Sequence, residues 1–275
     1  MAAAEKNGRW AMTESSWKVV MDRDGLTISG DRFKLTTSGA EPTQLEAVVS
    51  ELQSVTRATY GQYCGLSRAA EMVGERWGLL IIRDLLVSPK TVAELHNGLP
   101  RISEKLLTTR LKEMEYSGVI RRRDPVDGDH VVYELTEYGR ALEEALLALG
   151  RWGAISLATP RPEDIVTADS LIVAIRASFM PQAARGVHLT FVLNLGDIVL
   201  HAKIDDGAVA VGSGALADAD AVINPGAQLK ALLTGEISAE EALASRQVSV
   251  SGDPTMLNRF VELFQLPRLK APVPA

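Results

Sequence analysis

Basic side chains gather in one stretch of this acidic chain. Between Arg101 and Arg123, seven Lys and Arg residues stand against three acidic ones, a formal net charge of +4. The 275-residue chain as a whole carries −6, and the part from residue 159 onward carries −4, with nine basic and thirteen acidic residues. Because a local excess of positive charge attracts phosphates whatever the sign of the whole protein, this stretch predicts a nucleic-acid-binding surface.

The elements that must position these charges are predicted to be two helices joined by a tight turn. The first helix begins at Thr91, and Gly98 with Pro100 marks the turn. A second helix of about residues 103–117 follows, with Ser103 as its N-cap. Its apolar side chains recur at i, i+4 and i+7, the spacing of one buried face, and they are Leu107, Leu111 and Met114.

A hairpin is predicted directly after the second helix. One strand starts at Val119, Asp127-Gly128 marks the turn, and the returning strand ends at Leu135. A helix-turn-helix followed by a basic hairpin is the layout of a winged helix, which places its second helix in the major groove of DNA and its hairpin on the flanking backbone. We therefore predict that this region binds double-stranded DNA.

The predicted DNA contacts divide between the helix and the hairpin. Side chains of the helix are expected to contact bases or groove walls, since arginine can bind guanine bidentately. The consecutive arginines of the hairpin are expected to contact phosphates. The helix contributes Lys105, Thr108, Thr109 and Arg110, the hairpin contributes Arg121, Arg122 and Arg123, and Ser103 and Lys112 complete the set.

An ordered series of residues between Tyr60 and Gly153 has the pattern of a known family. The series consists of Cys64, Val73–Trp77, Ile81–Leu86, Leu99-Pro100, Ile102-Ser103, Leu107, Arg110-Leu111, Gly118, Tyr133–Thr136 and Gly139. It resembles the HxlR family of bacterial winged-helix transcription regulators. The resemblance covers about a third of the chain and implies a homodimer that binds an inverted or direct repeat upstream of regulated genes.

A further helix is predicted from Thr136 to about Ala158, with Thr136 as its N-cap. Its apolar stripe is longer than a small domain needs, which favours a partner helix in a second subunit. The alternative is that this helix packs only on its own domain. The stripe consists of Leu142, Leu146, Leu149 and Ile155.

Cys64, the single cysteine of the chain, is a candidate redox sensor. The resemblance implies this role, because some HxlR regulators sense oxidants or electrophiles through a cysteine at the corresponding place. A helix beginning near Leu66 could lower the thiol pKa through its N-terminal dipole. The alternative is a small residue packed at a dimer contact.

A second domain is predicted at 169–268, after a linker at 159–168 and before a tail at 269–275. Two prolines in Thr159–Pro162 support the linker. An amphipathic helix, several strands with alternating apolar residues, a hairpin turn at Asp206-Gly207 and further short helices follow. The expected fold class of the chain is α+β, a winged helix-turn-helix domain followed by a mixed α/β sheet domain.

The second domain resembles the sterol carrier protein type two family through Asp205–Gly207, Ala219–Ile223, Leu232–Gly235 and Val248–Asp253. The resemblance implies an apolar tunnel for lipids or other hydrophobic ligands, which in a regulator would be the sensor. The alternative is a filled structural core that serves assembly only. The predicted ligand-binding residues are Leu171, Ile175, Phe179, Phe191, Leu193, Leu200, Leu232, Phe260 and Phe264.

We find no catalytic constellation and predict neither an enzyme, nor a cofactor, nor a metal site. The segment Gly212–Ala217 matches G-x-G-x-x-A, but a strand follows it where a dinucleotide site needs a helix N-terminus. The four histidines are scattered and accompanied by one thiol, so they lack the spacing of zinc ligands.

The composition favours a cytoplasmic protein. An apolar content of 46% is enough for two domains with cores of their own. No window approaches the roughly 20 apolar residues of a membrane span, and the N-terminus lacks the charged start and apolar region of a signal peptide. A single cysteine agrees with a reducing compartment.

Residues 1–59 fit no helical period and are predicted to be a disordered extension. The stretch Trp17–Ile28 could form a hairpin around Asp24-Gly25, but two strands alone are marginal in water. A native start near Val55 is one hypothesis for the origin of this extension.

The sequence as a whole predicts a dimeric, DNA-binding transcription regulator whose C-terminal domain senses a hydrophobic ligand. The alternative is a lipid-binding or transfer protein whose winged helix mediates protein contacts only.

Overall fold

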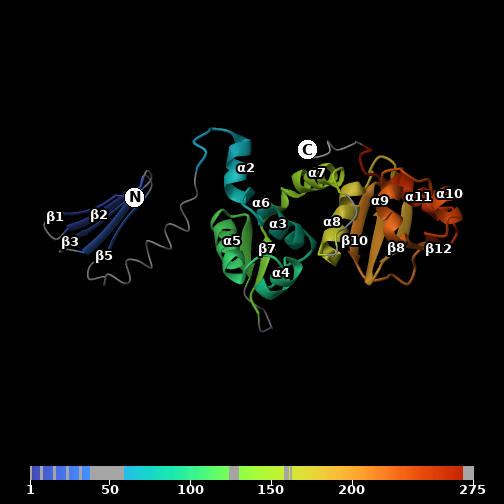
Figure 1. Ribbon diagram of the computed structural model, residues 1–275, viewed down its shortest axis with the longest axis horizontal. Coiled ribbons are helices and arrows are strands. Elements are labelled where there is room, and N and C mark those ends of the chain that lie inside the picture. Colours follow the sequence, from blue (N-terminus) through green and yellow to red (C-terminus); the bar gives the residue numbers. More distant parts are fainter. Residues whose placement is uncertain are drawn as a thin grey trace. The chain divides into compact units, whose positions relative to one another are not determined.

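The computed structural model describes the backbone of five strands between residues 2 and 37, and residues 59–123, 130–157, 161 and 163–268 with their side chains (Figure 1). By its internal contacts the chain divides into two units, Met1–Tyr60 and Gly61–Ala275. None of the helices in the described residues is long and apolar enough to cross a membrane.

The first unit contains an antiparallel five-stranded sheet in which the strands follow one another in chain order. Two residues join each pair of neighbours, so every pairing is a local hairpin. The prediction of a disordered extension is wrong for these strands. The hairpin considered at Trp17–Ile28 is present, and further strands extend it beyond the marginal two-stranded case. Residues 38–58, which include Val55, lie outside the described residues. The strands are β1 (Ala2–Lys6), β2 (Arg9–Glu14), β3 (Trp17–Asp22), β4 (Gly25–Gly30) and β5 (Phe33–Thr37).

The second unit begins with the predicted winged helix. Helix, turn, helix and hairpin follow in the expected order, and residues 124–129 at the hairpin tip lie outside the described residues. The elements are α2 (Gly65–Val73), α3 (Gly78–Val87), α4 (Val92–Gly98), α5 (Glu104–Tyr116), β6 (Ile120–Arg123), β7 (Val132–Leu135), α6 (Glu137–Arg140) and α7 (Glu143–Ala154).

Helix α5 is fixed by its N-cap and by its apolar face. The Ser103 hydroxyl accepts a hydrogen bond from the Leu106 amide at 3.3 Å, as the sequence predicts. Leu107 and Leu111 are fully buried and Met114 is 2% exposed, so the predicted buried face is confirmed. The opposite face of α5 is thereby turned to solvent.

The single helix predicted from Thr136 to Ala158 is two helices, α6 and α7. Helix α6 lies against the start of the hairpin, where the Thr136 amide donates to the Val119 carbonyl at 3.1 Å. A Cβ atom at Gly139 would lie 2.0 Å from that carbonyl oxygen, so the helix can approach this closely only because residue 139 is glycine. After α6 the chain turns at Ala141 and Leu142 before α7 begins.

The C-terminal module is a five-stranded sheet with helices, ordered β10-β9-β8-β11-β12. The hairpin turn predicted at Asp206-Gly207 joins β9 to β10, whereas β11 pairs in parallel with β8, because the chain crosses over instead of turning back. The elements are α8 (Ala168–Ser178), β8 (His188–Leu195), β9 (Ile198–Asp205), β10 (Ala208–Ser213), β11 (Ala221–Asn224), the 3-10 turn η1 (Gly226–Gln228), α9 (Leu229–Leu233), α10 (Ala239–Ala244), β12 (Ser249–Gly252) and α11 (Met256–Leu263).

Helix α8 belongs to both cores of the second unit. Val173 packs in the winged-helix core, whereas Ile175 and Phe179, at the end of the same helix, pack in the core of the C-terminal sheet. The predicted second domain at 169–268 begins within α8. Because α8 packs in both cores, this predicted boundary does not separate the winged-helix core from the core of the C-terminal sheet. The sequence indicated one apolar side of α8, and Val173 supplies a second.

The contact at Gly139 predicts how the winged helix responds to one added methyl group. We expect Gly139→Ala to lower the free energy of unfolding by about 1–3 kcal/mol, because the backbone must shift to accommodate the methyl group. Gly153→Ala is the matched control, since a Cβ at Gly153 would meet nothing within 4 Å. Thermal unfolding followed by circular dichroism measures both, and equal melting temperatures for the two variants would contradict the packing described here.

Candidate nucleic-acid interface

The solvent-facing side of α5 carries several of the predicted contacts. Lys105, Thr108 and Lys112 are exposed, and Thr109 is half-buried. The hydroxyls of Thr108 and Thr109 donate to the Glu104 and Lys105 carbonyls, both at 3.0 Å. A hydroxyl that donates within its own helix keeps its oxygen lone pairs for an outside donor.

Arg110 does not face solvent with the other predicted contacts. Its side chain is 17% exposed, and its guanidinium makes ion pairs with Glu113 at 2.6 Å and with Glu75 at 3.0 Å. Its Nε atom is buried without a partner among the described residues. We therefore withdraw the prediction that Arg110 contacts bases: two carboxylates neutralise its charge, and the side chain ties α5 to the turn before α3.

The three arginines of the hairpin strand β6 are exposed, as the phosphate-contact prediction requires. A buried carboxylate on the partner strand orders two of them. Glu134 is 7% exposed, lies opposite Arg121 in the strand register, and accepts from Arg121 Nε at 2.7 Å. Arg123 lies 3.7 Å from the same carboxylate. One negative charge thus orients two positive ones and leaves the strand with a net positive charge.

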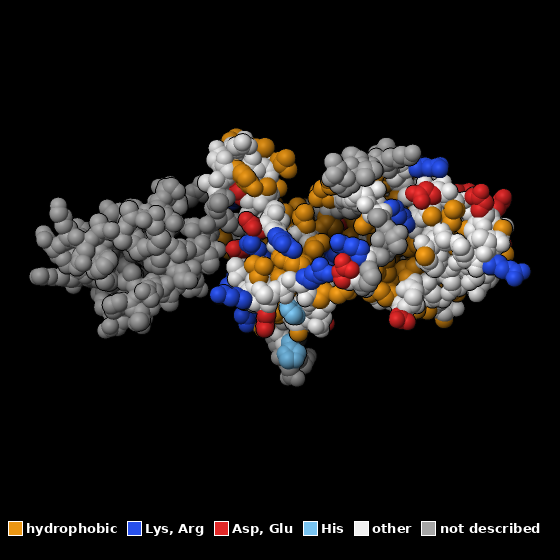
Figure 2. All heavy atoms as spheres, viewed as in Figure 1, with side chains coloured by type: hydrophobic (Ala, Val, Ile, Leu, Met, Phe, Trp, Pro, Cys, Tyr) orange, Lys and Arg blue, Asp and Glu red, His pale blue; other side chains and the backbone are white. Residues whose placement is uncertain are grey.

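Figure 2 shows Lys and Arg side chains over α5, at the lower left of the described surface. Lys105 and Lys112 form no ion pair with any described residue. Arg101, in the turn before α5, is exposed and donates to the Glu163 carbonyl at 3.3 Å. The exposed positive charge of α5 and of the turn before it therefore comes from Arg101, Lys105 and Lys112.

The acidic partners of these arginines are residues that the sequence reasoning missed. Glu113 stands three positions after Arg110 on the same helix, and this spacing is a signal that could have been read. Glu134 was accessible through the hairpin pairing once the register was known. Glu75 lies 35 positions from Arg110 and gave no local signal.

Cys64 occupies the N-cap position of α2 and is exposed. The amides of Ser67 and Leu66, with a smaller contribution from the Ser67 hydroxyl, lower the pKa of its thiol, because donors near the sulfur stabilise the thiolate. An exposed thiol of lowered pKa has the properties of a reactive cysteine.

The side chains predicted to line a ligand tunnel lie in or beside the core of the C-terminal module. All except Leu171, which is half-buried, are buried. Phenylalanine rings contact one another directly: Phe260 stacks on Phe264 at 4.8 Å between centroids, and Phe191 meets Phe260 edge-on at 5.5 Å. Mutual contacts of this kind agree with the alternative of a filled core. Among the described residues, no group of three or more His, Cys, Asp or Glu could hold a metal ion.

The winged helix and its basic surface are those of a DNA-binding transcription regulator, and comparison with known proteins identifies the kind. The sequence pattern of the HxlR-like helix-turn-helix family matches residues 72–159. The chain belongs to this family, whose compared members are transcriptional regulators and not enzymes.

Two relatives from Bacillus subtilis (strain 168) are similar to this region. The uncharacterized HTH-type transcriptional regulator YtcD is 42% identical over 86 residues, which are 30% of this chain and 68% of that protein. The HTH-type transcriptional regulator YodB is 36% identical over 88 residues, 32% of this chain and 79% of that protein. The crystal structure of quinone-bound YodB is 35% identical, covers 32% of this chain and 93% of that one, and has a TM-score of 0.29.

The environment of Cys64 predicts the pH at which its thiol reacts. A lowered pKa means that the thiolate is present at lower pH, so the alkylation rate should reach half its maximum below the value of about 8.5 for an ordinary cysteine. We expect Ser67→Ala to move this midpoint upward, because one stabilising group is lost. Alkylation by iodoacetamide followed by mass spectrometry measures the midpoint, with Cys64→Ser as the unlabelled control. A midpoint at or above that of glutathione would contradict the assignment.

Proposed function

We propose that this HxlR-like regulator binds double-stranded DNA in the cytoplasm as a homodimer, with α5 in the major groove and the β6 arginines on the flanking phosphates. The observation that carries the proposal is the set of exposed basic side chains on α5, the preceding turn and β6, two of which are oriented by the carboxylate of Glu134. Lys105, Thr108 and Thr109 remain the proposed base or groove-wall contacts, with Ser103 at the helix N-terminus and Lys112 toward the backbone.

Because the Arg110 side chain is largely buried, fewer side chains of α5 are available to recognise bases. Bidentate recognition of guanine requires a free guanidinium, and that of Arg110 is paired with Glu75 and Glu113. Lysine and threonine make fewer directed contacts, so the proposed reading of bases rests on Lys105 and the two threonines. Phosphate contacts from β6 supply the sequence-independent part of the affinity.

Exposed apolar side chains on α2 and α7 support the homodimer. On α7, Leu146 is buried in its own core, whereas Leu149 is 49% and Trp152 is 73% exposed. On α2, Leu66 is 79% exposed, and Figure 2 shows hydrophobic side chains on the surface of this helix. Helices that leave large apolar side chains in water are typical of an interface. Packing of α7 within its own chain and an interface with a second subunit therefore use different sides of the helix.

We infer two inputs to this regulator. Cys64 is the proposed sensor of oxidants or electrophiles, and the relative YodB is described in a quinone-bound form. The resemblance of the C-terminal module to sterol carrier proteins supports a hydrophobic ligand, whereas the contacts among its phenylalanines favour the structural alternative. The rival function is a lipid-binding or transfer protein whose winged helix contacts proteins only, and it predicts no DNA binding at low salt.

The wing arginines predict the salt dependence of DNA binding. Each phosphate contact contributes about 0.9 to the slope of log affinity against log salt, so Arg122→Ala with Arg123→Ala should reduce the slope by about 2. This double variant leaves the pair of Arg121 with Glu134 intact. Arg259→Ala is the control, because Arg259 lies on α11 of the C-terminal module and is paired with Glu262, and its slope should equal that of the wild type. Fluorescence anisotropy at several salt concentrations measures the slopes; an unchanged slope in the double variant would contradict the phosphate assignment.

The proposed interface predicts the oligomeric state of a single variant. The wild-type chain of 29.7 kDa should have the mass of a dimer by light scattering. Trp152→Asp should yield a monomer, because a charged side chain would be buried without a partner in the apolar interface. Ile165→Asp alters a side chain that is 60% exposed outside the proposed interface and should leave the dimer intact. A dimer that persists in Trp152→Asp would place the interface elsewhere.

A further inference from the structure

Lys90, between α3 and α4, connects three elements of the winged helix at one residue. Its backbone forms both hydrogen bonds of an isolated bridge with Tyr133 of β7: its amide donates to the Tyr133 carbonyl at 3.0 Å, and the Tyr133 amide donates to its carbonyl at 2.7 Å. Lys90 is thus paired with the wing strand β7 through a single antiparallel bridge. A displacement of Lys90 would therefore be transmitted to β7 through these two backbone hydrogen bonds.

The next residue, Thr91, fixes the first helix of the helix-turn-helix. Its hydroxyl accepts from the Glu94 amide at 3.2 Å, and the Glu94 carboxylate accepts from the Thr91 amide at 2.7 Å. This reciprocal capping box sets where α4 begins. Because Lys90 and Thr91 are adjacent, the positions of the wing and of α4 are determined by the same two residues.

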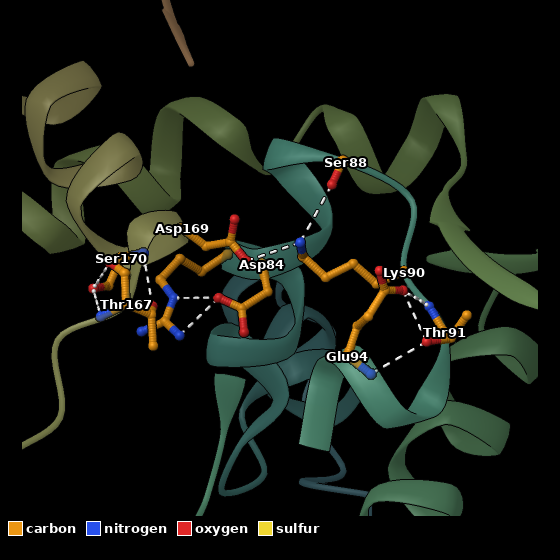
Figure 3. A network of polar contacts seen from close by, with 9 residues as sticks. Asp84, Ser88, Lys90, Thr91, Glu94, Thr167, Asp169 and Ser170 are labelled. Atoms are coloured by element: carbon orange, nitrogen blue, oxygen red, sulfur yellow. Dashed lines mark hydrogen bonds and ion pairs between the residues drawn. The ribbon is translucent and has the colours of Figure 1, made fainter. Parts of the chain in front are cut away.

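The side chain of Lys90 reaches the C-terminal module. Its ammonium lies 2.9 Å from Asp169 in the first turn of α8, and the two side chains are 12% and 21% exposed (Figure 3). A capping box between Thr167 and Ser170 holds this first turn in place. An ion pair that is mostly withdrawn from water is little screened by salt, unlike one at the surface.

A second carboxylate lies beside the pair. Asp84 is fully buried, accepts from Arg83 Nε at 2.8 Å, and has one oxygen without a hydrogen-bond partner among the described residues. Burial is the main cause that raises the pKa of its carboxyl, and the charge of Lys90 opposes this shift. Loss of the Lys90 ammonium would leave Asp84 and Asp169 as two partly uncompensated charges near Arg83.

Helix α8 carries the connection into the C-terminal sheet. Arg176, further along the helix, is paired with Glu143 of α7 and donates to the Leu86 carbonyl at 3.5 Å. Beyond the helix, the Met180 amide donates to the Leu263 carbonyl at 2.8 Å, next to the Phe179 and Phe264 rings. A displacement in the core of the C-terminal module would therefore move Asp169 as part of a rigid helix.

We propose that Lys90 and Asp169 are positioning residues for DNA binding: through this ion pair, α8 of the C-terminal module sets the placement of α4 and the wing. Neither residue contacts DNA in this arrangement. The inference rests on the proposed DNA-binding function and adds how the C-terminal module acts on it.

A double-mutant cycle on the full-length chain tests this proposal. The probe is a duplex selected from a random-sequence pool by the wild-type protein, and its affinity is measured by anisotropy. Lys90→Met and Asp169→Asn are each expected to lower the affinity about fivefold or more, within the range of typical couplings between sites. The double variant should be no weaker than the weaker single variant, because the two residues act as one pair.

Two readouts separate positioning from other roles. The salt slope of each variant should equal that of the wild type, since loss of a phosphate contact would lower it by about 1. The exchange Lys90→Asp with Asp169→Lys should recover at least part of the affinity and of the melting temperature. The matched control is Arg259→Gln with Glu262→Gln, a pair on α11 whose side chains are 37% and 57% exposed, and it should have no effect.

Unchanged affinity in both single variants would overturn the inference while leaving the proposed function intact. Additive losses in the double variant, or a lower salt slope for Lys90→Met, would also overturn it, since they indicate independent roles or a direct phosphate contact. If Lys90→Met is too unstable for its DNA affinity to be measured, Asp169→Asn, which retains the shape of the side chain, decides. Its affinity should then be lowered about fivefold or more with an unchanged salt slope, and an unchanged affinity would overturn the inference. A wild-type protein that selects no duplex would overturn the proposed function, and the inference with it.

Discussion

Burial of one side of α5 is the constraint on which the DNA-binding surface depends. Leu107, Leu111 and Met114 are almost completely withdrawn from water, and each contributes on the order of 1.5–3 kcal/mol to folding. Rotation of α5 about its axis would expose these side chains. The direction in which Lys105 and Lys112 point is therefore set mainly by hydrophobic packing on the far side of the helix, and the ion pair of Arg110 with Glu75 adds a polar tie to the turn before α3.

Carboxylates near the basic residues determine which of the positive charges are available to bind DNA. Glu75 and Glu113 remove Arg110 from the exposed set, whereas Glu134 holds Arg121 and Arg123 in place without neutralising the strand. Arginines predicted from the same basic stretch thus have different roles: Arg110 is paired internally, whereas Arg121 and Arg123 remain exposed. The number of basic residues in a segment is a poor measure of the charge that a ligand meets, because folding pairs some of them internally.

Local signals in the sequence were sufficient for the winged helix. The N-cap Ser103, the spacing of Leu107 and Leu111, and the glycine after α5 each act within a few residues of themselves, and the structure has α5 and its hairpin where these residues predict them. Contacts that join distant segments were not readable. The pairing of Arg110 with Glu75, the parallel pairing of β11 with β8, and the second apolar side of α8 depend on tertiary packing.

The N-terminal strands were missed for a different reason. Strands β1, β2 and β3 have the sequences AAAEK, RWAMTE and WKVVMD, which lack the strict apolar/polar alternation that indicates a strand. Their regular succession, with two residues between neighbours, was the stronger indication of a sheet, since repeated short hairpins support one another.

Sharing of α8 between two cores makes the second unit a single cooperative structure. Val173 and Ile175 lie two positions apart on α8 but belong to different hydrophobic clusters. Unfolding of α8 would therefore expose apolar surface in both clusters. Amide hydrogens in the winged helix and in the C-terminal sheet should then exchange with solvent through common opening events. Replacing either module by an unrelated one would therefore remove part of the packing of the module that remains.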